Sequence, residues 1–124
     1  MKHEEALQMA VCTYIKLQYP NTIFTSESSG LKLTIGQSVK AKKMRSSDKL
    51  PDLWILCPNK HYHGLFIELK TDPIYKKDMA TFKTDHIKSQ AKTIKRLCDL
   101  GYYAEFAIGF KEAKALIDIY MNDN

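Results

Sequence analysis

Long apolar runs are missing from this 124-residue chain. No stretch of it approaches the roughly 20 consecutive apolar residues that are needed to cross a bilayer. The first 14 residues also lack the basic start, the apolar block and the small-residue cleavage site that mark a signal peptide. We therefore expect a cytoplasmic protein without a membrane-spanning segment.

Cysteines are also few, and their spacing does not predict a crosslink. Cys12, Cys57 and Cys98 are odd in number, far apart and embedded in apolar runs, which favours reduced thiols in the core over a disulfide framework or a zinc site. Internal repeats, low-complexity tracts and a glycine-rich phosphate loop are absent as well. The sequence thus gives no support to nucleotide-triphosphate chemistry, and we expect no nucleotide cofactor.

The size and charge of the chain indicate what it can be. A chain of 124 residues with 44% hydrophobic content can build one compact domain over residues 1–124 and is too short for two ordinary domains. The formal net charge is +5 and the pI is near 9.1, so a polyanion would be attracted at neutral pH. Charge alone does not distinguish nucleic acid from an acidic membrane or an acidic protein.

A basic segment covers residues 31–50. It combines a single acid, Asp48, with six basic residues: Lys32, Lys40, Lys42, Lys43, Arg45 and Lys49. Gly36, Ser46 and Ser47 favour a loop here, with or without a short strand over residues 31–35. A loop of this length in a compact domain is more often functional or disordered than idle, although a solvated loop kept soluble by lysine fits the sequence equally well.

The hydrophobic pattern predicts seven helices and strands. Apolar residues recur at helical spacing in three segments and form short runs typical of strands in four others. In chain order these are helix 4–18, strand 22–26, strand 52–57, strand 65–70, helix 86–100, strand 102–110 and helix 111–121. The second and third strands flank a polar turn and predict an antiparallel hairpin. The order α-β-β-β-α-β-α predicts an α/β fold with a central mixed sheet flanked by helices.

The predicted hairpin brings ionisable residues together at one end. If the hairpin folds about a centre near Lys60, Asp52 lies opposite Glu68. Because side chains alternate along a strand, Glu68 and Lys70 share one face while Leu69 turns to the other. Two carboxylates held this close beside apolar residues repel each other unless a cation lies between them. Mg²⁺ suits such a site, since it takes oxygen ligands and typically binds one or two carboxylates with waters and a substrate phosphate.

These three groups together predict metal-dependent hydrolysis of a phosphodiester bond. A bound ion can polarise a phosphoryl oxygen and lower the pKa of an attacking water, and Lys70 could orient that water or offset charge on the phosphate. The alternative is a surface strand with an ordinary Glu–Lys alternation and an aspartate placed by chance. Pro51 and Asp52 opening one strand, with Glu68 and Lys70 closing its partner, favour the catalytic interpretation.

The same residues resemble a known family. Pro51, Asp52, Glu68 and Lys70 match the signature of the PD-(D/E)XK nuclease superfamily, and a longer set resembles its VRR-NUC domain. The set, in order, is EEALQ (4–8), PDLWIL (51–56), GLFIELK (64–70), SQ (89–90) and LGYYAEFAIGFKEA (100–113). The resemblance covers nearly the whole chain and implies one VRR-NUC-like nuclease domain with a restriction-endonuclease-like core.

The resemblance also implies roles for the residues of the hairpin. Asp52, Glu68 and the main-chain carbonyl of Leu69 would bind Mg²⁺ or Mn²⁺, and Lys70 would be the catalytic lysine. One departure lies just before the signature, where many relatives have glycine and this chain has Lys49. That departure affects the loop leading into the site, and with it the geometry of the substrate, more than it affects the metal ligands.

Two further site residues are implied on helices. Glu4 best matches the family's acid on the first helix, where it would join the catalytic and metal-binding set, and Glu5 is the fallback. Gln90 would lie on the helix after the signature and face the site, although Ile87 stands where relatives often have a small hydroxyl residue. Without the family, Glu4 is an acid that complements a helix dipole and Gln90 is an exposed helix residue.

The activity implied by the resemblance is a structure-selective DNA endonuclease. Small stand-alone members of the family are of virus and phage type, which implies a homodimer that cuts branched DNA such as Holliday junctions, in the host cytoplasm if the source is viral. Contacts to the DNA backbone are expected from basic residues in two segments: Lys40, Lys42, Lys43, Arg45, Lys76 and Lys77. The alternatives are a non-catalytic nucleic-acid-binding protein with a nuclease fold and a sequence-specific restriction-type nuclease.

Overall fold

Eight helices and strands follow one another in the computed structural model, which describes residues 3–27 and 33–123. They are α1 (His3–Gln18), β1 (Phe24–Ser26), α2 (Ile35–Lys43), β2 (Leu53–Ile55), β3 (Leu65–Lys70), α3 (Asp85–Asp99), β4 (Tyr103–Ile108) and α4 (Gly109–Met121). All seven predicted elements are present, three of the strands with shorter ends than predicted, and α2 is an additional helix.

The four strands form one mixed sheet in the order β1-β2-β3-β4. The pairs β1–β2 and β2–β3 are antiparallel, whereas β3 and β4 run parallel. Within the β2–β3 hairpin, Leu53 pairs with Ile67 and Ile55 pairs with Leu65, which is the register predicted from a centre near Lys60. Asp52, one residue before β2, therefore comes next to Glu68.

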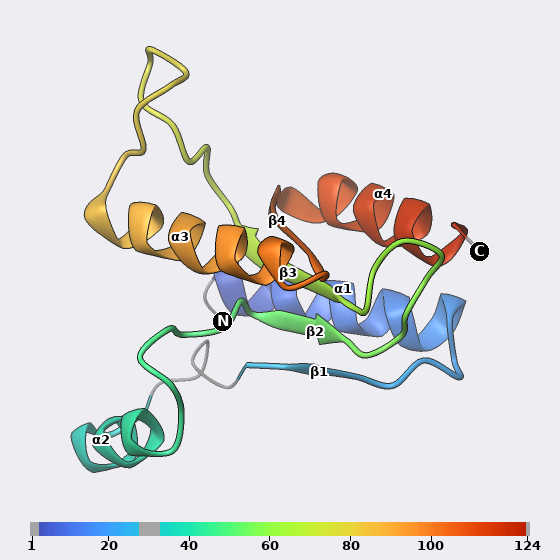
Figure 1. The fold of residues 1–124 in the computed structure, drawn as a ribbon, viewed down its shortest axis with the longest axis horizontal. Coiled ribbons are helices and arrows are strands. Elements are labelled where there is room, and N and C mark those ends of the chain that lie inside the picture. The colour runs from blue at the N-terminus through green and yellow to red at the C-terminus, as the bar shows by residue number, and fades with distance from the viewer. Residues whose placement is uncertain (1–2, 28–32, 124) are drawn as a thin grey trace.

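Helices cover both faces of the sheet, with α1 and α4 on one face and α3 on the other (Figure 1). The larger core lies on the face that carries α1 and α4. Val11 and Ile15 of α1 and Ile117 of α4 pack there against Leu53 and Ile67 of the central strands, and each of these five side chains is at most 1% exposed. This burial holds the two strands of the hairpin rigidly in place.

The smaller core lies beneath α3 and positions the acidic end of β3. Alternation along β3 turns Phe66, Glu68 and Lys70 toward the α3 side. Phe66 packs with Ile94 and Leu97 of α3. Glu68 lies two residues further along β3 than this apolar contact. The residue four positions before Ile94 on the same helix face is Gln90.

The prediction of a loop over residues 31–50 is wrong for its middle part, which forms α2. The Thr34 hydroxyl accepts a hydrogen bond from Gln37 N (3.1 Å), and the Gln37 side chain accepts one from Thr34 N (2.9 Å), so a capping box starts the helix. None of its residues is buried, and the missing apolar stripe explains why periodicity did not reveal it. No strand forms over residues 33–50, and residues 31 and 32 of the suggested strand lie outside the described residues.

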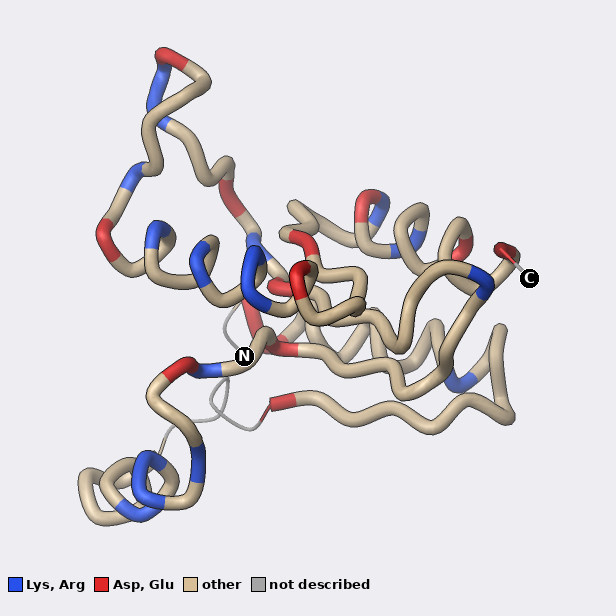
Figure 2. The backbone as a smooth tube through the Cα atoms, in the orientation of Figure 1, with Lys and Arg blue, Asp and Glu red and all other residues tan. Residues whose placement is uncertain are grey.

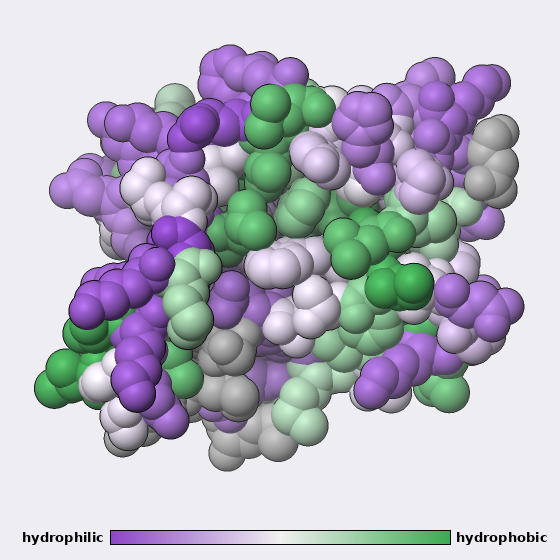
Figure 3. Space-filling view, turned by 60° about the horizontal axis from the view of Figure 1, so that its bottom comes forward, coloured by the Kyte–Doolittle hydropathy of each residue, from purple (hydrophilic) through white to green (hydrophobic). Residues whose placement is uncertain are grey.

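The predicted core location of the cysteines is only partly correct. All three thiols are free; Cys12 and Cys57 are half-buried, but Cys98 is exposed, because Leu97 is the residue of that helical turn that enters the core. Among the described residues, no helix is long and apolar enough to span a membrane. Apolar residues still form a broken band across one face of the molecule, between hydrophilic ends (Figure 3).

Candidate active site

Two carboxylates meet at the end of the hairpin, as the register requires. Glu68 lies on β3 and is 5% exposed, and its carboxyl is in hydrogen-bond contact with that of Asp52. The backbone of β3 also holds Asp52 in place, since Asp52 Oδ2 accepts a hydrogen bond from Leu69 N at 3.0 Å. The Asp52 carboxylate therefore spans from the backbone of β3 to the side chain beside it.

The proximity of the two acids changes the protonation of Glu68. Burial contributes most, and the hydrogen bond and negative charge of Asp52 add to it, so that the pKa of Glu68 rises from 4.5 to about 9. The positive charges of Lys70 and Lys49 act in the opposite direction. Without a cation, the pair shares one proton at neutral pH, because two adjacent carboxylates with little access to water cannot both ionise at low cost.

Gln90 joins the two acids from α3. The helix begins at Asp85 and is capped by Thr84, whose side chain accepts a hydrogen bond from Ile87 N, and its next turn carries Gln90. There Gln90 Nε2 donates to Glu68 Oε1 at 2.7 Å. Its other amide atom, Oε1, is buried and accepts no hydrogen bond from the described residues. The site thus offers a buried hydrogen-bond acceptor beside the carboxylates, to which an ordered or metal-bound water could donate.

The residues present suit a hard divalent cation. Asp52 and Glu68 supply carboxylate oxygens, the raised pKa of Glu68 shows that the pair requires a proton or a cation, and Gln90 Oε1 is a free acceptor. Mg²⁺ and Mn²⁺ match such a donor set, since both take oxygen ligands and keep several waters. Among the described residues, however, no group of three or more acidic, histidine or cysteine side chains is arranged to hold a metal, so the protein contributes two carboxylates.

Lys70 lies at the end of β3 and is half-buried. It shares the face of Glu68 and acts electrostatically on its carboxyl. The intervening Leu69 turns its side chain into the larger core, where it is 5% exposed. The lysine is thereby placed beside the acids, at the margin of the sheet and partly exposed to solvent.

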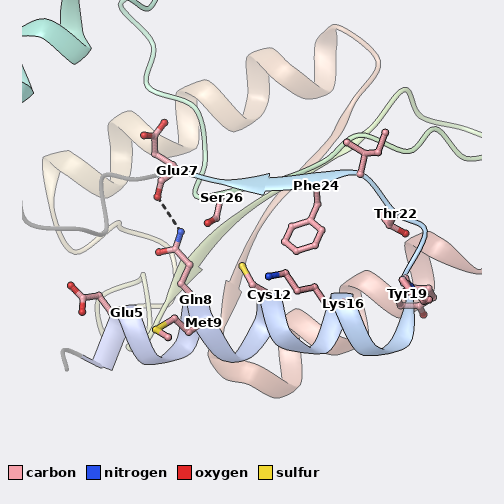
Figure 4. Close-up of a pocket in the computed structure, with 12 residues that line it drawn as sticks. Glu5, Gln8, Met9, Cys12, Lys16, Tyr19, Thr22, Phe24, Ser26 and Glu27 are labelled. Carbon is pink, nitrogen blue, oxygen red and sulfur yellow. Dashed lines mark hydrogen bonds between the residues drawn. The ribbon is translucent and has the colours of Figure 1, made fainter.

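Glu4 is not brought into this cluster. It is exposed in the first turn of α1, and α1 covers the opposite face of the sheet from α3, the helix that carries Gln90 (Figure 1). The fallback Glu5 is half-buried and faces a groove between α1 and β1 (Figure 4). A role for either acid in binding metal therefore stays a prediction, as does the role of the Leu69 carbonyl.

The groove of Figure 4 is about 690 Å³ in volume and is lined mainly by residues of α1 and by the edge strand β1. Neither Asp52 nor Glu68 lines this groove. It still borders the site indirectly: Gln8 Nε2 donates to Glu27 O at 3.1 Å, and Glu27 N donates to Asp52 O at 2.6 Å. Two hydrogen bonds thus tie α1 to the backbone of the aspartate.

Sequence reasoning missed the contacts that hold the loop before Asp52. Asp48 forms an ion pair with Arg96 of α3, and Trp54 Nε1 donates to Pro51 O at 2.7 Å. Between these anchors, Lys49 acts on the Glu68 carboxyl. The only signal in the sequence was that Lys49 replaces a glycine of the resembled pattern.

The predicted DNA-binding residues lie on two segments that flank the acids. Lys40, Lys42 and Lys43 are on α2 and Arg45 follows it; Lys76 and Lys77 are in the loop 71–84, and all six are exposed. Both segments project from the end of the sheet at which β2 begins and β3 ends (Figure 1). Figure 2 shows their basic residues in blue on either side of the red acidic positions. The acids are therefore approached between two basic projections.

The fold is that of a VRR-NUC domain. A solved structure described as a "VRR_NUC domain protein" superposes with a TM-score of 0.71, and the similarity covers 100% of this chain and 92% of that chain at 23% sequence identity. The predicted α/β, restriction-endonuclease-like core with a central mixed sheet is thereby confirmed. No protein-family model matches the sequence, and no curated protein matches it either.

Proposed function

We propose that this protein is a metal-dependent endonuclease that hydrolyses phosphodiester bonds in DNA, with a preference for branched substrates such as Holliday junctions. One observation carries the proposal: Asp52, Glu68 and Gln90 are in hydrogen-bond contact at the end of β3, with Lys70 beside them. A nuclease fold supports it. A structural acid pair would not need a lysine and a glutamine converging on it.

Each residue of the cluster has a chemical role in this proposal. Asp52 and Glu68 would hold Mg²⁺ or Mn²⁺, with the Leu69 carbonyl as a further ligand. The ion, when bound, would polarise a phosphoryl oxygen and lower the pKa of the attacking water. Lys70 orients that water or offsets negative charge that develops on the phosphate. Gln90 positions the Glu68 carboxylate through its 2.7 Å hydrogen bond.

The proposed substrate is DNA because the approach to the acids is basic. The six exposed basic residues of α2 and loop 71–84 can contact successive phosphates on both sides of the cut. A homodimer, which the family resemblance implies, would present two such sites to opposing strands of a symmetric junction. Glu4 would enter the site only if α1 moves, or if the DNA brings it closer, and it is the least supported member of the proposed set.

The loop 71–84 is expected to contribute to the salt dependence of DNA binding. Replacing Lys76 and Lys77 with alanine should reduce the slope of log K against log[salt] by roughly 2, because each lost phosphate contact removes about 0.9 from that slope. Fluorescence anisotropy of a labelled four-way junction at several salt concentrations measures it. Lys60→Ala, in the turn at the far end of the hairpin, serves as the control and should leave the slope unchanged. A slope equal to that of the wild type in the double variant would remove this loop from the DNA-binding surface.

Metal dependence is tested with labelled four-way junctions and linear duplexes of the same sequence. We expect incision of the junction with Mg²⁺ or Mn²⁺ and none with chelator, because the acid pair alone holds a proton rather than an activated water. Binding without incision under every metal condition would instead support a non-catalytic nucleic-acid-binding protein. Equal cutting of the linear duplex at one fixed sequence would support a restriction-type nuclease.

A further inference from the structure

The loop 71–84 is a structured hairpin rather than a flexible connection. It leaves the sheet directly after Lys70 and returns at the start of α3 (Figure 1). Its two strands pair at Tyr75 and Phe82 through an isolated antiparallel bridge. Lys76 N donates to Thr81 O at 2.7 Å, and Lys83 N donates to Ile74 O at 2.9 Å. The projection is therefore hydrogen-bonded over most of its length, and we call residues 74–83 the hairpin arm.

Aromatic stacking and a buried root stiffen the arm. The rings of Tyr75 and Phe82 stack with their centroids 5.1 Å apart and their planes at 17°. At the root, Ile74 is only 7% exposed. The ring stack joins the two sides of the arm and the buried Ile74 anchors its root, so both features restrict the motion of the arm relative to β3.

The tip of the arm presents a methionine to solvent. Met79 is 76% exposed, and its backbone has φ 60°, a left-handed conformation that costs a residue other than glycine roughly 1–2 kcal/mol. Asp78 maintains this turn: its carboxylate accepts hydrogen bonds from the backbone N of Ala80 and Thr81, at 2.9 Å each, and from the Thr81 hydroxyl at 2.5 Å. A large apolar side chain is thus displayed at a position that would be less strained as glycine.

The two sides of the arm differ in character. One side borders a polar hollow of about 590 Å³ with three lysines, Lys76, Lys83 and Lys88, and one acid, Asp85. The other side forms, with β4 and α4, a mainly apolar groove of about 510 Å³, and Met79 is among the residues that line it. The lysine side suits a phosphate backbone, whereas the exposed methionine suits the apolar face of a base pair.

We infer that the hairpin arm is a wedge that enters branched DNA where its strands part, with Met79 against the exposed face of the last base pair. This inference rests on the proposed nuclease function and names the feature that selects its substrate. Apolar side chains such as methionine are known to insert between base steps, at a cost of a few kcal/mol for unstacking in continuous duplex. At a branch point the stack is already interrupted, so that most of this cost is absent and branched DNA is preferred.

The geometry of the fold supports this placement. The arm begins only a few residues after Lys70, so DNA strands that part at the arm would run toward the end of β3, where Asp52 and Glu68 lie. The second basic projection, α2, lies on the other side of the acids and would contact the opposite arm of the duplex. The cut is then directed to the neighbourhood of the branch.

Met79→Gly tests the wedge without disturbing the fold, because glycine accepts the left-handed backbone at no steric cost. The thermal midpoint of this variant should equal or exceed that of the wild type. With chelator present, we expect the wild type to bind a four-way junction at least tenfold more tightly than a linear duplex of the same length. Met79→Gly should lower that ratio by about tenfold, and Met79→Leu should retain it. Leu100→Gly, at the 66% exposed C-cap of α3, is the matched control and should also retain it.

A 2-aminopurine base beside the branch point supplies a second readout. Its fluorescence should rise when the wild type, Met79→Leu or Leu100→Gly binds, and should stay near that of the free junction with Met79→Gly. An unchanged binding ratio and an unchanged fluorescence response in Met79→Gly would overturn the wedge. So would a loss of preference that sedimentation traces to a changed oligomeric state, since Met79 would then serve the groove beside α4.

The two proposals fail separately in this experiment. Binding and fluorescence are measured without metal and do not require cleavage. Absence of incision by the wild type on every DNA with Mg²⁺ and Mn²⁺ would overturn the nuclease function, while the binding ratio still decides the wedge. Intact incision with an unaltered junction preference in Met79→Gly would overturn the wedge alone.

Discussion

Asp52→Asn and Lys70→Ala should each reduce junction cleavage by at least two orders of magnitude while leaving the fold and DNA binding intact. Asparagine retains an oxygen that can accept the hydrogen bond from Leu69 N, which is 3.0 Å long in the wild type, but it loses the negative charge that a divalent cation requires. Alanine at position 70 removes the only lysine on β3. Losing one preorganised charge-stabilising group typically costs about 10²–10³ in rate.

Single-turnover cleavage of a labelled four-way junction measures this effect, and anisotropy on the same junction reports binding. Asp99→Asn and Lys95→Ala are matched controls, because these two residues form an exposed ion pair at 3.3 Å on α3 and should cut at the rate of the wild type. Cleavage by Asp52→Asn within threefold of the wild type would contradict the proposed metal site. Loss of cleavage in the Asp99→Asn control would show that charge alone, rather than this cluster, determines the rate.

Glu68→Gln should separate stability from catalysis, abolishing cleavage while stabilising the metal-free protein at alkaline pH. The pKa of Glu68 rises from 4.5 to about 9 on folding, through burial first and then through Asp52. Between these two values the folded state binds the extra proton, so the free energy of unfolding falls as pH rises. Below pH 4.5 the contribution is fully present, and above about pH 9 it is lost. Glutamine mimics the protonated acid and removes this dependence.

Thermal unfolding in chelator at pH 5.5 and pH 8.5 tests the sign. The free energy of unfolding of the wild type should fall by about 1 kcal/mol per pH unit relative to Glu68→Gln. The upper limit for one proton is about 1.4 kcal/mol per pH unit. At pH 8.5 the variant should therefore melt several degrees higher, about 5 °C or more for a domain of this size. Glu105→Gln, an exposed acid on β4, is the control and should follow the wild type.

Mg²⁺ completes this experiment with a readout other than activity. A cation that replaces the shared proton should raise the melting temperature of the wild type at pH 8.5 and should do so less at pH 5.5, where protons compete for Glu68. Glu68→Gln should respond weakly at both values. A wild type whose stability increases with pH relative to Glu68→Gln would contradict the assignment of Glu68 as the protonated member of the pair.

Much of the fold could be predicted because its patterns are local. The helices α1, α3 and α4 carry apolar residues at helical spacing, and the β2–β3 hairpin carries two short apolar runs around a polar turn. The side-chain period of a strand is two, so a shift of one residue would expose every core residue of the hairpin. This constraint made the contact of Asp52 with Glu68 predictable from residue numbers alone.

Other parts could not be predicted because the patterns are weak or the contacts distant. Helix α2 has no buried residue, so its only signal was the capping box of Thr34 and Gln37. Cys98 lies in an apolar run, yet the rotation of α3 turns Leu97 rather than Cys98 into the core. Neither periodicity nor composition reports the rotation of a helix end at the level of one residue.

The sequence by itself determined the strand order of the hairpin, its register and the meeting of two acids and a lysine at its end, because one-to-one pairing converts sequence position into spatial position. Only the tertiary structure decided which distant groups join them. It placed Gln90 against Glu68 through the packing of α3, left Glu4 exposed, and brought Lys49 within electrostatic range. It also set the hairpin arm on the same end as the acids. Such contacts depend on how helices lie on the sheet, and that is decided by the packing of the whole core.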